Sequence, residues 1–179
     1  MGCMRTFTLV AAATLAFISA CSPQQNWRQV TFEGTRLQAQ LPCKPDRTQR
    51  EVPLGGQPLQ LAVAGCESGD AMVAVMTATL APGMDVQNVL QGWQQATLQN
   101  LHADPSVHSE AWSRPGLLTL GAAQRLRAQG QRADGRSVTM QAVWGALTEG
   151  DRVRVVHAVV YAPQVPPALA QTLFDGVQP

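Results

Sequence analysis

Residue types that could carry out catalysis or bind a metal are few in this chain. The histidines are His102, His108 and His157. His102 and His108 are six positions apart, a spacing that suits neither a helix nor a strand as a metal-binding element. His157 lies within an apolar segment, where a hydrogen-bonded structural histidine is more common than a ligand. Residues 106–110 contain serine, histidine and glutamate, but catalytic triads are assembled from distant segments. We therefore predict no catalytic residue and no metal ligand.

Acidic and glycine residues give no stronger signal for an enzyme. Glu67 with Asp70, and Glu149 with Asp151, are the closest acidic pairs, and each stands at a predicted turn. Acids are common in turns because they bond to the local backbone and to water. No glycine cluster follows a strand and opens a helix, so the pattern of a phosphate-binding loop is absent. We expect no cofactor and a protein that is not an enzyme.

Four arginines could form a basic stripe on one face of the predicted sheet. Arg125 and Arg127 alternate along one segment, and Arg152 and Arg154 alternate two strands later. A solvated sheet face is the simpler interpretation. The alternative is a docking patch for an acidic partner or a lipid headgroup.

Cys21 has a more specific context than any of these residues. It follows an apolar run of about a dozen residues, Phe7 to Ile18, which is shorter than the ~20 residues that a membrane-spanning helix needs. Arg5 precedes the run, as in a signal peptide. The run ends Ile18-Ser19-Ala20-Cys21, which resembles the lipobox of bacterial lipoproteins. Residues 1–20 are thus predicted to be a lipoprotein signal peptide, and Cys21 to carry the lipid. The alternatives are an ordinary secretory signal or an N-terminal membrane helix.

The resemblance to a lipobox also implies a location. Two or three acyl chains are enough for stable anchoring to a bilayer. Ser22 follows the cysteine, and a residue other than aspartate there favours the outer membrane in a double-membrane cell. We expect residues 21–26 to form a lipidated tether that holds the domain on the cell envelope, facing the periplasm.

Cys43 and Cys66 would remain in the mature protein. In an oxidising compartment, an even pair of cysteines most often forms a disulfide. A metal site is a weaker alternative, since no histidine lies near either cysteine, and a redox pair would usually have Cys-x-x-Cys spacing. We predict a Cys43–Cys66 disulfide.

The charge balance argues against nucleic acid as a partner. The 179-residue chain has 13 basic and 12 acidic residues, and one basic residue, Arg5, belongs to the predicted signal. The mature chain would therefore be neutral, without a general attraction for nucleic acid. About 159 residues suit one domain with a sizeable core.

The elements that must position these residues follow from periodicity and turn signals. Strands are predicted at 36–41, 50–54, 59–64, 71–80, 107–112, 122–131, 137–146 and 152–161. Apolar residues at three- and four-residue spacing predict a helix at 85–101 with Asp85 as its N-cap, and Pro166-Pro167 begins a second helix at 166–177. The sequence predicts a single α+β domain over 27–179: a mostly antiparallel sheet of about six to eight strands with two packed helices.

Two short motifs accompany this order of elements. Leu41-Pro42-x-x-Pro45 closes an early strand, and Ala170–Phe174 lies in the final helix. The chain resembles small envelope lipoproteins with a PsbP-like (DcrB-like) domain over roughly residues 27 to 178. The resemblance implies the fold and the location, and members of that family act mostly as accessory or assembly factors. It supplies no catalytic residues.

Two functions remain open from the sequence. The first is a non-enzymatic envelope lipoprotein that binds a protein partner or aids assembly. The alternative is a module that binds a small ligand or a lipid in a cleft between helix 85–101 and the sheet.

Overall fold

Nine strands and two helices are present in the computed structural model, which describes residues 25–132 and 134–179. The strands are β1 (Arg28–Thr31), β2 (Gln38–Leu41), β3 (Asp46–Leu54), β4 (Gln57–Ser68), β5 (Ala71–Thr79), β6 (His108–Ala111), β7 (Gln124–Gln131), β8 (Ser137–Glu149) and β9 (Arg152–Ala162). The helices are α1 (Val86–Asn100) and α2 (Pro167–Asp175). The domain belongs to the predicted α+β class.

Seven of the strands form one antiparallel sheet in the order β3-β4-β5-β9-β8-β7-β6. This number lies within the predicted six to eight. β1 and β2 pair with each other in a separate two-stranded sheet. β1 was not predicted because it is four residues long and buries only Val30, too little for an alternating pattern to be visible.

α1 follows closely from its sequence. The carboxylate of Asp85 accepts hydrogen bonds from the backbone N–H groups of Gln87 and Asn88, which otherwise have no partner in the first turn. Leu90 and Trp93 face the sheet and are buried. The predicted helix at 85–101 is confirmed, with its two end residues serving as caps.

The second helix is shorter than predicted. α2 ends at Asp175, because the chain beyond Gly176 turns to pair with β2 instead. The backbone groups of Gln178 and Gln38 exchange two hydrogen bonds at N···O distances of 2.7 and 3.0 Å. Residues 176–178 thereby join the small sheet to the C-terminus.

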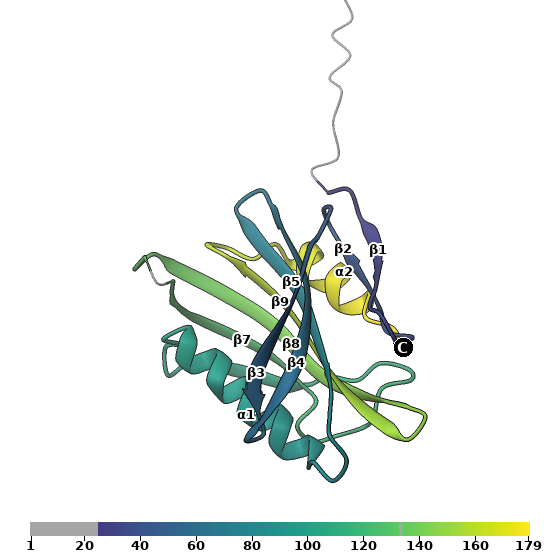
Figure 1. Cartoon of the computed structure of the whole chain (residues 1–179). Coiled ribbons are helices and arrows are strands. Elements are labelled where there is room, and N and C mark those ends of the chain that lie inside the picture. Colours follow the sequence, from purple (N-terminus) through teal and green to yellow (C-terminus); the bar gives the residue numbers. More distant parts are fainter. Residues whose placement is uncertain (1–24, 133) are drawn as a thin grey trace, which may run out of the picture.

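The elements form three layers (Figure 1). α1 lies against one face of the seven-stranded sheet, and α2 with the β1–β2 hairpin lies against the other. Each face has its own apolar core. β9 is central in the sheet, and residues 155–160 of this strand are all buried. We call the two sides the α1 face and the α2 face.

The predicted signal peptide and Cys21 lie outside the described residues. Asn26, placed in the tether by sequence, belongs to the domain, because its backbone N–H donates to the carbonyl of Pro42 at 2.8 Å. Among the described residues, neither helix is long and apolar enough to cross a membrane.

Candidate functional site

Two rows of bulky side chains cross the α1 face, and their positions follow from strand register. Residues on β5, β9 and β8 stand side by side in each row, because paired residues of neighbouring strands point to the same face. One row is Met72, Tyr161 and Met140, and the other is Met76, His157 and Trp144.

The row between them is made of smaller side chains. Ala74, Val159 and Ala142 are paired across the same three strands, and Gly65 of β4 extends the row beyond Ala74. A Cβ atom on Gly65 would lie 3.0 Å from the carbonyl oxygen of Val73, so little can be added there without displacing backbone. Gly65, Ala74 and Val159 of this row border open space on the α1 face.

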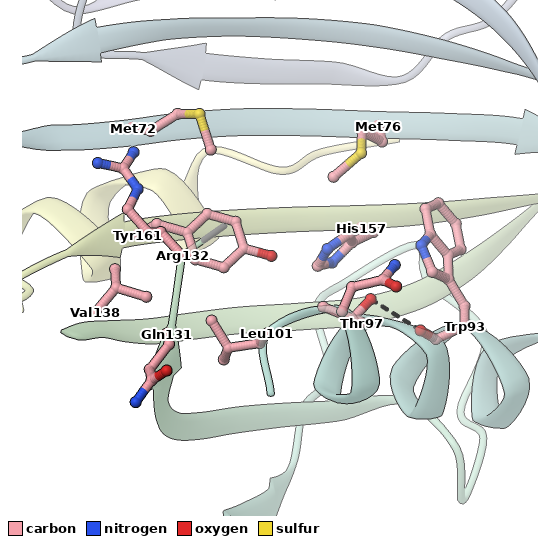
Figure 2. A pocket seen from close by; sticks show the side chains of 11 residues that line it. Met72, Met76, Trp93, Thr97, Leu101, Gln131, Arg132, Val138, His157 and Tyr161 are labelled. Carbon is pink, nitrogen blue, oxygen red and sulfur yellow. Dashed lines mark hydrogen bonds between the residues drawn. The ribbon is translucent and has the colours of Figure 1, made fainter. Parts of the chain in front are cut away.

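Between α1 and the two bulky rows lies a hollow, a cavity of ≈ 310 Å³. Trp93, Thr97 and Leu101 line it from the helix side, and Met76 and Tyr161 from the sheet (Figure 2). The volume is at the lower end of the range of ~300–1,000 Å³ common for small-molecule pockets. The predicted location of a cleft, between helix 85–101 and the sheet, therefore contains a cavity.

The hollow continues past the end of the helix. A second concavity of ≈ 560 Å³ shares Met72, Met76 and Tyr161 with the first and extends to the beginning of β3 and to Cys66 of β4. Met72 is the large apolar residue with the greatest exposure among those described, at 38%. The two parts together form what we call the α1 cleft, lined by the residues of both concavities.

His157 is the most deeply buried polar group of the α1 cleft, at 1% exposure. Its ring stacks on Trp144 at 4.2 Å between centroids and meets the ring of Trp93 edge-on at 5.2 Å. The Nδ1 atom lies 3.1 Å from the carbonyl oxygen of Val143. A carbonyl only accepts, so Nδ1 carries the proton and Nε2 is a hydrogen-bond acceptor. Burial lowers the pKa of His157 to about 3, so the ring is neutral near pH 7.

Tyr161 contributes the other polar group of the cavity wall. Burial raises the pKa of its phenol to about 12, so the hydroxyl keeps its proton. Figure 2 shows that this hydroxyl points along the cavity toward His157. These two residues thus give the sheet side of the cavity one acceptor, Nε2, and one hydroxyl that can donate.

Three further polar residues line the cavity: Asn100, Gln131 and Arg132. Gln131 and Arg132 lie at the end nearer Tyr161 (Figure 2). Gln131 is exposed and Arg132 is half-buried. The lining residues of this cavity include no aspartate or glutamate. A buried cation would therefore find no opposite charge there.

The other histidines and the sequence around His108 do not form a site. Ser106, His108, Ser109 and Glu110 are all exposed, the last three on the edge strand β6. Ser109 bonds to Gln124, and Glu110 lies 3.6 Å from Arg125. His102 is exposed just beyond α1. No group of three or more histidine, cysteine or acidic residues in the described part of the chain could hold a metal ion.

The sequence predicts Glu149 to be an ordinary acidic residue of a turn, but its side chain is largely buried and bonded to residues of another segment. Its side chain is 15% exposed and accepts from the hydroxyl of Thr35, the backbone N–H of Arg36 at 2.7 Å and Nε of Arg154 at 2.7 Å. Burial acts to raise the pKa of Glu149, but these hydrogen bonds outweigh it, and the pKa lies below its usual value. Glu149 fastens the loop between β1 and β2 to the main sheet. Asp151, by contrast, is exposed.

The four arginines do not make a continuous basic stripe. Arg154 is committed to Glu149, and its side chain is 12% exposed. Arg125 bonds to Gln141 and lies over the ring of Phe174, at 5.2 Å from the centroid. Arg127 and Arg152 are exposed. Two of the four arginines on the predicted solvated face, Arg125 and Arg154, therefore make contacts within the domain.

Cys43 and Cys66 are joined as the sequence predicts. Their sulfur atoms are 2.02 Å apart and their Cα atoms 6.1 Å apart. The bond connects the segment after β2 to β4, so it links the small sheet to the large one.

No family model matches the chain, and no curated protein shows significant similarity to it.

Tyr161, Met72 and Met76 were not predicted as site residues. The pattern of their strands indicates only that they share a face with residues two positions away. What brings them together is the pairing of β5 with β9, which no local signal in the sequence specifies.

Proposed function

We propose that this protein is an envelope lipoprotein, anchored through Cys21, whose domain binds a small, largely apolar ligand in the α1 cleft. The observation that supports binding is the cavity itself: a hollow between a helix and a sheet that combines apolar side chains with a few polar ones, His157 and Tyr161 among them. Most ligand sites in proteins have this composition. The role is non-enzymatic.

A binding role is favoured over catalysis by the chemistry of the lining. A general acid or base works best when its pKa is near the working pH. His157 is neutral with a pKa of about 3, and Tyr161 is protonated with a pKa of about 12. Both are suited to hydrogen bonding and unsuited to proton transfer near pH 7.

An accessory or assembly role with an envelope protein partner is the second candidate. Its support is the resemblance to the PsbP-like lipoproteins, while the arginines that could have formed a docking patch are partly used within the domain. The α1 cleft makes the small ligand the better supported of the two.

Native mass spectrometry of the full chain, purified from its own membrane, tests ligand binding. We expect a co-purifying small molecule with the wild-type chain. Ala74→Leu adds volume in the second concavity of the α1 cleft and should reduce the occupancy of the ligand, whereas Ala111→Leu, on the exposed edge strand β6, should not. Absence of any ligand from the wild-type chain, or equal loss in the two variants, would contradict the proposal.

Metabolic labelling with an alkyne analogue of palmitate tests the anchor. We expect the wild-type chain to be labelled and to sediment with membranes, and Cys21→Ser to lose the label. Cys43→Ser is the matched control, since it also removes a thiol and should keep the label. A labelled Cys21→Ser chain would show that the anchor is assigned to the wrong residue.

A further inference from the structure

We propose that the ligand of the α1 cleft is a neutral aliphatic molecule with a hydroxyl group, which donates to Nε2 of His157 and accepts from the hydroxyl of Tyr161. This inference rests on the proposed binding function and specifies its ligand class. It is carried by the arrangement of the two polar groups inside the cavity.

The first step concerns His157. A buried acceptor without a partner is costly, so buried polar atoms are almost always hydrogen-bonded. His157 is 1% exposed and uses Nδ1 to bond to Val143. The described residues supply no hydrogen bond to Nε2. Nε2 is not among their fully buried atoms that lack a partner, so it borders the open space of the cavity that His157 lines. A ligand that donates a hydrogen bond would give Nε2 of His157 the partner that the protein does not supply.

The second step concerns Tyr161. Its hydroxyl points along the cavity toward His157 (Figure 2). A ligand hydroxyl has one proton to donate and lone pairs to accept. It can therefore serve both residues at once, whereas an ether oxygen serves only Tyr161.

The third step excludes charged head groups from this position. A carboxylate would present lone pairs to the lone pair of Nε2 and would lose its hydration inside apolar walls. An ammonium would have no acid to pair with, because the lining of the cavity contains none. Of the described residues that line the cavity of ≈ 310 Å³, the one cation that could attract a phosphate or carboxylate is Arg132, at the far end from Trp93. The second concavity is lined by Lys44, Arg47 and Arg50, away from His157.

Three probes of equal chain length separate these chemistries: 1-octanol, methyl octyl ether and octanoate. The full chain is held in nanodiscs at pH 7, and binding is followed by the change in total tryptophan emission, to which Trp93 contributes from the cavity wall. Empty nanodiscs titrated in parallel correct for partitioning into lipid. We expect 1-octanol to bind about tenfold more tightly than the ether, the size expected when a buried acceptor is left without a donor. Octanoate should bind at least as weakly as the ether.

Three variants assign the effect to residues. Tyr161→Phe should weaken 1-octanol and the ether by a similar factor, about fivefold, because both lose the same donor. His157→Phe should abolish the preference for 1-octanol over the ether. Thr119→Val is the matched control: it removes a threonine hydroxyl at an exposed position outside both concavities, so ligand affinities should not change.

The outcomes distinguish this inference from the proposed function. Equal affinities for 1-octanol and the ether, or tighter binding of octanoate, would overturn the hydroxyl assignment and leave the cleft as a binding site. If none of the three probes binds, the proposed function fails as well. Should His157→Phe not fold, the wild-type preference and the Tyr161→Phe result still decide the question.

Discussion

At the scale of single residues, His157 couples the cleft to the stability of the fold. The ring lies between Trp93 and Trp144, in contact with both, and its one protein hydrogen bond goes to a backbone carbonyl. Such a group is accommodated only in its neutral form. Adding a proton would place a charge among aromatic side chains with no acid nearby to balance it.

The stability of the protein should therefore fall in mild acid. The pKa of His157 is about 3 in the fold and about 6.5 in an unfolded chain, so between these values the unfolded state binds more protons. We expect His157 to remove roughly 1.4 kcal/mol of unfolding free energy per pH unit below about pH 6.5. Denaturant unfolding from pH 7 to pH 4 measures this slope. His157→Gln should flatten it and the exposed His108→Gln should not; parallel curves for all three chains would show that the ring is not held neutral.

Glu149 is a second residue whose environment can be tested directly. Glu149→Gln removes the charge that Arg154 pairs with and should cost about 1–3 kcal/mol of unfolding free energy. Because the pKa of Glu149 is lowered in the fold, this contribution is present above about pH 4.5 and is lost as the pH falls through the folded value. Thermal melts at pH 7 and pH 3 measure it. The neighbouring Asp151→Asn should behave as wild type; an equal effect there would refute a specific role for Glu149.

At the scale of elements, the sequence predicted those features that depend on residues within a single segment. Asp85 and the apolar spacing after it gave α1 to within one residue at each end, because capping and amphipathicity act within the segment. The face on which His157 lies, shared with Val155, was also predictable from alternation. The partners of Glu149 were not, since Thr35 is 114 positions away and reaches it only through the packing of the two sheets.

Loss of the Cys43–Cys66 disulfide should lower the unfolding free energy more than the other changes described here. It closes a loop with a separation of 23 residues, worth on the order of 3 kcal/mol in the chain-entropy account. We expect Cys43→Ser to lower the melting temperature clearly, and a reductant to do the same to the wild-type chain and not to the variant. Identical melting of wild type with and without reductant would indicate that the bond makes no contribution.

At the scale of the whole molecule, the sequence predicted one sheet with two helices, and the structure adds a third layer. The β1–β2 hairpin and α2 together cover the α2 face, where they bury Leu37, Leu41 and Phe174. Periodicity indicates which residues are buried, but it does not indicate which of two faces a helix covers. The cleft likewise depends on α1 covering only part of its face, a property of the assembled layers that no single segment encodes.

The position of the disulfide also determines how the domain would carry a mechanical load. Tension applied through the N-terminus enters at Asn26, beside Pro42, and reaches Cys43 after the β1–β2 hairpin. From Cys43 it can pass through the sulfur bridge directly to Cys66 in β4. β3 lies wholly within the closed loop between the two cysteines, so it is outside this path. Under a pull from the N-terminal side of the domain, the edge strand β3, and with it one wall of the cleft, would therefore lie outside the loaded segment for as long as the bond is intact.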